Sequence, residues 1–120
     1  MPINKLEHKG KEVIYVDYQS CRSDFERLKQ LEETAQFLSQ HQGNALVLVD
    51  LRGQSGRSKE FMERAKELEP NYGHNVSKRA ILGIDGLKKV LLMAFNRFSK
   101  NSTKTVPFDT KDKALDFLIT

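Results

Sequence analysis

The chain has 120 residues, of which 38% are hydrophobic and 30% charged, and its net charge is +4. This composition excludes a disordered chain, and the single cysteine, Cys21, excludes an internal disulfide and a cysteine-rich zinc site. No apolar run approaches the roughly 20 residues needed to cross a bilayer. The first residues lack the apolar core of a signal peptide. We therefore expect a single cytoplasmic domain spanning residues 1–120.

The first predicted elements are a β-hairpin and a helix. The β-branched and aromatic run 12–18 predicts a strand, which residues 3–7 are expected to join across a turn where Gly10 takes a positive φ. Ser23 and Glu26 fit a capping box that begins a helix, and Gly43 suits the C′ position that ends it. The inward face of this helix is expected to carry apolar residues at helical spacing: Phe25, Leu28, Leu31, Ala35 and Leu38.

The next elements are a buried strand and a second helix. Residues 44–50 form an almost continuous apolar run, which is typical of a strand covered on both faces, with Val47 and Val49 buried. Ser58 suits the N-cap of a helix that turns Phe61, Ala65 and Leu68 inward. We expect this helix to stop at residues 69–73, where a proline and a glycine lie close together.

The last elements continue the alternation. Residues 80–84 predict a strand, Asp85 caps a long third helix, and residues 104–108 form a short strand that Pro107 places at an edge. Asp109 or Thr110 then caps a terminal helix whose inward residues are Ala114, Leu115 and Leu118. This order predicts an α/β fold with a mixed, largely parallel sheet of four to five strands, flanked by about four helices.

Three segments carry a family resemblance: the central strand and its exit (47–51), the next strand with its basic lead-in (78–83), and the closing strand and helix (107–118). In this layout the chain resembles the STAS domain, and more closely its small bacterial branch called SpoIIAA-like, which is related in shape to the anti-sigma-factor antagonists. The resemblance implies an interaction or ligand-sensing module more readily than an enzyme.

The resemblance departs from the antagonists at their phosphorylation site. Those domains carry an Asp-Ser-Ser-Gly-like stretch at the start of the second helix, where a serine is phosphorylated. Here residues 52–59 read RGQSGRSK, and only Ser55 with Gly56 matches. Ser55 and Ser58 are the candidates by position. Because no acidic residue precedes them, we expect Ser58 to act as an N-cap and to resist phosphorylation.

The positive charge lies in the second half of the chain. Residues 1–60 hold 9 basic and 9 acidic side chains, whereas residues 61–120 hold 11 basic and 7 acidic ones, and 11 − 7 gives the whole +4. Between residues 73 and 108, seven basic residues face a single acidic one, Asp85. Such a region favours an anionic partner, and the alternative is an ordinary solvated face.

Two candidate binding regions follow. The loop before the second helix offers glycines, a helix N-terminus and cations to an anion, without the spacing of a phosphate-binding P-loop: Gly53, Gly56, Arg57, Ser58 and Lys59. The third helix is expected to place an apolar pair among polar residues as a contact surface, exposed in a monomer and covered in a homodimer or complex: Lys88, Lys89, Leu92, Met93, Asn96 and Lys100.

These features support one leading hypothesis and two alternatives. The leading one is a non-enzymatic STAS-like module that docks an acidic protein partner. The first alternative is a module that binds a small anionic ligand or a lipid at the 53–59 loop, and binding a lipid there would bring the protein into peripheral contact with a membrane. The second alternative is an enzyme that uses Asp50 and Asp85. Metal and cofactor binding are disfavoured because the three histidines lack ligand spacing, and nucleic acid because no recognition motif is present.

Overall fold

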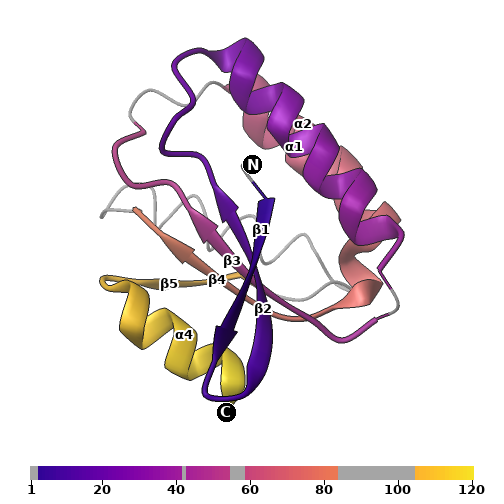
Figure 1. Ribbon diagram of the computed structural model, residues 1–120. Coiled ribbons are helices and arrows are strands. Elements are labelled where there is room, and N and C mark those ends of the chain that lie inside the picture. The colour runs from indigo at the N-terminus through magenta and orange to yellow at the C-terminus, as the bar shows by residue number, and fades with distance from the viewer. Residues whose placement is uncertain (1–2, 42, 55–58, 84–104) are drawn as a thin grey trace.

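The structure is a computed structural model that describes residues 3–41, 43–54, 59–83 and 105–120. Its centre is a five-stranded sheet (Figure 1). The strands lie side by side in chain order: β1 (Ile3–His8), β2 (Lys11–Asp17), β3 (Ala45–Asp50), β4 (Val76–Leu82) and β5 (Thr105–Phe108). The pair β1–β2 is antiparallel and every later pair is parallel, which confirms the predicted mixed, largely parallel sheet.

The described helices cover both faces of this sheet. Helices α1 (Asp24–Ser39) and α2 (Lys59–Tyr72) lie together on one face, and α4 (Lys111–Ile119) lies on the other (Figure 1). A short 3₁₀ turn, η1 (Gly73–Asn75), joins α2 to β4. Each face of the sheet has its own apolar cluster, so β3 is apolar on both sides and lies in the middle of the sheet, as its sequence predicts. Val47 is buried there, whereas Val49 is only half-buried.

The predicted hairpin turn and edge strand are confirmed. Lys9 and Gly10 alone connect β1 to β2, and both have positive φ, 51° and 84°, as a type I′ turn requires. Strand β5 lies at the other edge of the sheet, where Pro107 has no N–H to offer to a further strand.

Helix α1 begins as predicted, but the prediction for Phe25 is wrong. The Ser23 side chain accepts a hydrogen bond from the Glu26 N–H at 3.2 Å, and Glu26 in turn accepts from the Arg22 N–H at 2.6 Å. Phe25 is 76% exposed. At 100° per residue it lies 120° from Leu31, because successive three-residue steps drift around the helix. The helix also ends earlier than expected, at Ser39, and Gly43, with φ 82°, lies in the turn beyond.

Helix α2 ends at Tyr72, within the predicted stop at residues 69–73, although Pro70 lies inside its last turn. Proline removes one backbone hydrogen bond inside a helix, which favours an end there. Two buried side chains offset this loss: Tyr72 packs in the core, and Glu69 forms an ion pair with Arg79 of β4 at 2.7 Å. These tertiary contacts hold the last turn against the sheet.

The terminal helix matches its prediction. Thr110 is the N-cap of α4 and accepts a hydrogen bond from the Lys113 N–H at 3.3 Å. The three inward residues are buried: Ala114, Leu115 and Leu118. The predicted third long helix after Asp85 lies outside the described residues.

Candidate functional site

The carboxyl ends of the parallel strands form the candidate site. Asp17 of β2 pairs in register with Asp50 of β3, and Asp50 with Leu82 of β4, so the three strands end level with one another. Backbone hydrogen bonds continue beyond the strands, from the Tyr18 N–H to the Asp50 carbonyl and from the Leu51 N–H to the Leu82 carbonyl, both at 2.9 Å. Open α/β sheets usually bind their ligands at this edge.

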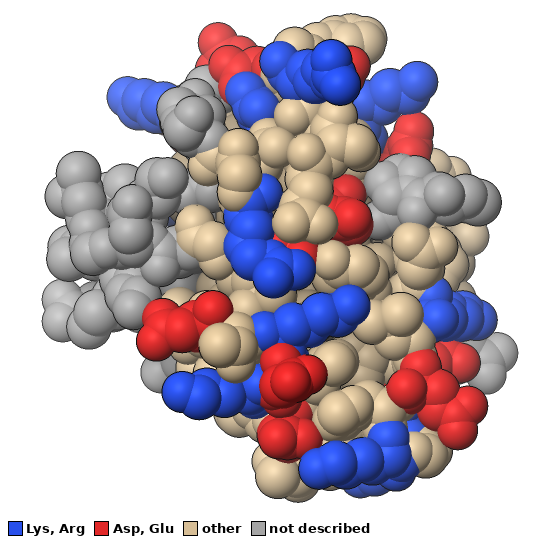
Figure 2. All heavy atoms as spheres, turned by 60° about the vertical axis from the view of Figure 1, so that its left-hand side comes forward, with Lys and Arg blue, Asp and Glu red and all other residues tan. Residues whose placement is uncertain are grey.

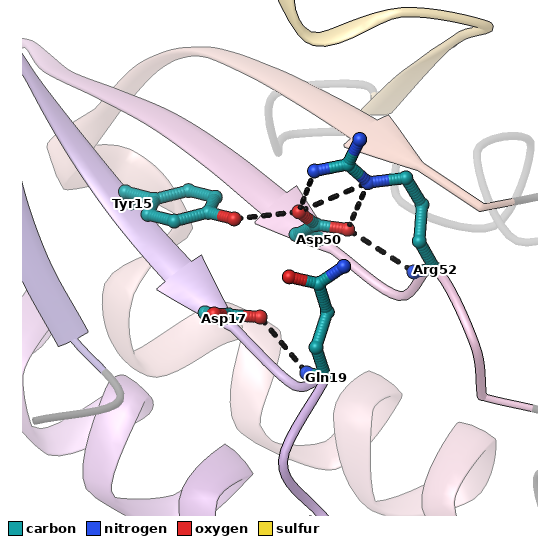
Figure 3. Close-up of polar contacts among 5 residues, drawn as sticks. All are labelled: Tyr15, Asp17, Gln19, Asp50 and Arg52. Atoms are coloured by element: carbon teal, nitrogen blue, oxygen red, sulfur yellow. Dashed lines mark hydrogen bonds and ion pairs between the residues drawn. The ribbon is translucent and has the colours of Figure 1, made fainter.

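Asp50 is the polar centre of this edge (Figure 3). Its side chain is fully buried and faces the α4 side of the sheet, as its neighbour two residues back, Leu48, does. It accepts a hydrogen bond from the Tyr15 hydroxyl at 2.6 Å. Arg52 donates three times to the same carboxylate: from its backbone N–H at 3.1 Å, from Nε at 3.0 Å and from Nη2 at 2.7 Å. Asp50 thus holds the turn after β3 through the Arg52 N–H and also forms an ion pair with the Arg52 side chain.

These contacts determine the charge states of Asp50, Tyr15 and Arg52. Burial alone raises the pKa of Asp50, but the hydrogen bonds from Arg52 and Tyr15 outweigh it and leave that pKa below its usual value. Burial, with the hydrogen bond to Asp50, raises the pKa of Tyr15 to about 12. The hydrogen bond to Asp50 likewise raises the pKa of Arg52. At neutral pH the site therefore holds a carboxylate, a neutral phenol and a guanidinium.

The Arg52 side chain is partly exposed. Nε and Nη2 bind Asp50, no hydrogen bond of Nη1 is drawn among the residues of Figure 3, and the side chain as a whole is 43% exposed. Lys111, at the start of α4, lies with its ammonium 4.5 Å from the centre of the Tyr15 ring. Figure 2 views the molecule from the side where the strands end, and basic side chains lie near the middle of that face with acidic ones beside them. Two cations thus accompany one buried carboxylate.

The loop after Arg52 is anchored to the rest of this edge. Gln54 is buried and accepts from Nη1 of Arg27 at 2.8 Å, while its own amide donates to the Cys21 carbonyl at 3.1 Å. Gly83, at the exit of β4, lies against the same loop: a Cβ there would come within 2.5 Å of the Arg52 backbone nitrogen and of the Leu51 carbonyl carbon. The backbone that carries Arg52 is therefore held from both sides.

The structure describes only part of the predicted sites. In the 53–59 loop, Gly53 is exposed with φ 79°, and Lys59 is 88% exposed with Glu63 at 3.8 Å. The rest of that loop and the predicted contact surface lie outside the described residues: Ser55, Gly56, Arg57, Ser58, Lys88, Lys89, Leu92, Met93, Asn96 and Lys100. Asp85, the second carboxylate of the enzyme alternative, lies outside them as well.

The basic lead-in to β4 is internal and does not form a basic surface. Arg79 is buried, and it binds Glu69 and the Thr105 hydroxyl, the latter at 2.8 Å. Lys78 donates to the Phe117 carbonyl at 3.3 Å, near the end of α4. These two residues of the 73–108 region are therefore committed to the fold, which corrects their assignment to a region that attracts anions.

Sequence reasoning missed Arg52 and Tyr15. Tyr15 is 35 residues from Asp50, and only the parallel register brings the two together. The sequence nevertheless contains a signal. Two apolar runs each end in an aspartate, Asp17 and Asp50, and Tyr15 stands two residues before Asp17. Cys21 is half-buried, and burial raises the pKa of its thiol.

Comparison with solved structures identifies the fold. The chain is similar to a protein from Shewanella loihica PV-4, an uncharacterized protein from the DUF3478 family with a SpoIIAA-like fold. The two share 20% sequence identity over 97% of this chain and 91% of that chain, with a TM-score of 0.66. The fold is SpoIIAA-like. The predicted STAS resemblance is thus confirmed at the level of fold, while comparisons with family models and with curated proteins find no match.

In the described part of the chain, no helix is long and apolar enough to span a bilayer. Nor do its histidine, cysteine, aspartate and glutamate side chains form a group of three or more placed to hold a metal ion.

Proposed function

We propose that the protein is a non-enzymatic, SpoIIAA-like regulatory module that docks acidic side chains of a partner protein at Arg52. The observation that carries the proposal is the Arg52 guanidinium, which binds the buried Asp50 through Nε and Nη2 although the Arg52 side chain is 43% exposed. A planar guanidinium binds a second carboxylate well when its orientation is already fixed, because little side-chain entropy is then lost on binding.

The surroundings of Arg52 favour an anionic contact. Lys111 adds a second cation on the α4 side, and the exposed Gly53 leaves the backbone of the loop accessible. The contact surface predicted on residues 88–100 remains part of the proposal on sequence grounds, since it also combines cations with apolar side chains.

The titratable groups at this edge support a module without chemistry of its own. A general acid or base works best with a pKa near the operating pH. Asp50 is fully buried with a lowered pKa, and the pKa of Tyr15 is about 12. The Cys21 thiol has a raised pKa, which disfavours the thiolate that a nucleophile needs.

We expect Arg52→Lys to weaken partner retention about tenfold. A planar guanidinium can bind Asp50 with two N–H groups and offer others to a second carboxylate, whereas a lysine ammonium cannot bind both in this way. The measurement is a pulldown from the native cell with mass spectrometry of proteins and small molecules. Lys29→Ala, which removes one exposed cation on α1, is the control and should retain the partner.

Each outcome of this experiment separates the hypotheses. Loss of a protein partner by Arg52→Lys, in a variant that far-ultraviolet circular dichroism shows to be folded, supports docking of an acidic partner. Co-purification of a small phosphate or carboxylate compound that Arg52→Lys loses would favour the ligand alternative instead. Equal retention by wild type and Arg52→Lys would refute a role for Arg52 in either.

A further inference from the structure

A large apolar side chain lies exposed at the start of α1, on the opposite face of the sheet from α4. Phe25 is 76% exposed, and it is the large hydrophobic residue that stands out to solvent among the described residues. It is placed in the first turn of a helix whose start is fixed by the Ser23 cap, so its exposure is set by the helical register. An exposed aromatic ring of this kind commonly anchors a binding surface.

Phe25 leads into a groove between α1 and α2. Leu28 and Glu32 lie three and seven residues further along α1, on the same side of the helix as Phe25. These two residues line one wall of a hollow of about 310 Å³. The other wall is one face of α2: Glu60, Glu63, Arg64 and Glu67. Leu28 is the apolar side chain of this lining, and Phe25 lies one turn before it on the same side of α1.

The groove is acidic, in contrast to the basic chain as a whole. Four glutamates line it against one arginine, which leaves three negative charges. Arg64 is already paired with Glu32 and with Glu67, the latter at 3.0 Å. Glu60 makes no ion pair with a described residue, and Glu63 pairs only with the highly exposed Lys59 at 3.8 Å. Glu60 and Glu63 therefore keep most of their charge available to a partner.

We propose that this groove, with Phe25 at its end, docks a basic segment of another protein that carries an apolar side chain. The acidic wall selects lysine or arginine and rejects acidic segments, while Phe25 and Leu28 bury the apolar side chain. This surface is distinct from the Arg52 site in position and opposite to it in charge. The module would then bind an acidic partner at one face and a basic one at another.

A model peptide tests the proposal without knowledge of the natural partner. The probe is an amphipathic peptide of alternating Lys and Leu blocks, and the control peptide replaces each Lys by Glu. Binding is followed by the amide shifts of ¹⁵N-labelled protein and by fluorescence anisotropy. The Lys peptide should shift amides of α1 and α2 around Phe25, Leu28 and Glu60, more weakly at high salt, and the Glu peptide should not.

Two variants and a matched control complete the test. Phe25→Ser and the double charge reversal Glu60→Lys, Glu63→Lys should each weaken binding of the Lys peptide about tenfold. Glu33→Lys makes the same kind of charge change on another face of α1 and should alter binding less than about twofold. All four altered positions are exposed, so all variants should stay folded.

Three results would overturn the proposal. The first is equal binding of the two peptides. The second is equal affinity for the Lys peptide in Phe25→Ser, in the double charge reversal of Glu60 and Glu63, and in Glu33→Lys. The third is a concentration-dependent dimer, seen by sedimentation, that Phe25→Ser dissociates, because the groove would then be covered by a second copy of the chain.

Discussion

Replacing Asp50 by alanine should lower the free energy of unfolding by about 3 kcal/mol, because it breaks a buried ion pair. The substitution removes the acceptor of the Tyr15 hydroxyl and leaves Arg52 without its counter-charge. The loss should be smaller than for a fully buried pair, since Arg52 is 43% exposed and can regain water. Chemical denaturation at pH 7 measures the effect directly.

Asp50 should also contribute to the decrease in the free energy of unfolding at acidic pH. Its pKa in the folded protein lies below the usual value for an aspartate, so the unfolded chain takes up the proton first as the pH falls. The contribution of Asp50 is therefore present above about pH 4 and is lost below it. Asp50→Asn should flatten the loss of stability between neutral and acidic pH.

Asp17→Ala is the matched control at the same edge of the sheet. Asp17 is half-buried, and its side chain accepts one hydrogen bond, from the Gln19 N–H at 2.8 Å. Its loss should cost less than about 1 kcal/mol. If Asp50→Ala costs no more than Asp17→Ala, the buried pair does not organise this edge.

The second large effect is expected at Gly83, which should tolerate no side chain. Its φ is 89°, and an added Cβ would lie 2.5 Å from two backbone atoms of Leu51 and Arg52. Those atoms cannot move freely, because the Leu51 N–H is hydrogen-bonded to the Leu82 carbonyl. Gly83→Ala should therefore cost at least about 3 kcal/mol, as strain and overpacking combine.

Gly53→Ala separates these two causes. Gly53 has a similar φ of 79°, but nothing lies within 4 Å of a Cβ added there. Its substitution should cost only the conformational strain, about 1 kcal/mol. Thermal melts of both variants give the comparison, and a Gly83→Ala protein too unstable to purify would agree with the prediction. Similar melting temperatures for the two would mean that β4 does not approach the Arg52 loop so closely.

Local patterns were enough to predict the sheet. Each strand has its own signal in composition, and the turn at Lys9–Gly10 has its own signal in Gly10, so none of them needs knowledge of distant residues. Helix α2 ends within its predicted range, and Pro70 stays inside the helix where the ion pair of Glu69 with Arg79 and the packing of Tyr72 hold the last turn. Phe25 was misplaced because a three-residue spacing drifts around a helix.

The site was less predictable than the fold. The strand end at Asp50 was identified from sequence, and so was the adjacent glycine-containing loop. The roles of Tyr15 and Arg52 depend on the register of β2 against β3 and on the burial of a carboxylate, which no local pattern reveals. The same limit explains Arg79, which looks like surface charge in the sequence and is buried against Glu69.

The most direct test of anion docking at Arg52 is a titration of ¹⁵N-labelled protein with a short peptide rich in aspartate and glutamate. The proposal predicts saturable shifts of the Arg52 Nε–H signal and of the Gly53 and Gln54 amides, which weaken as salt is added and vanish in Arg52→Lys. An unchanged Arg52 Nε–H signal at peptide concentrations that shift other residues would contradict it, and so would a complete lack of saturable binding.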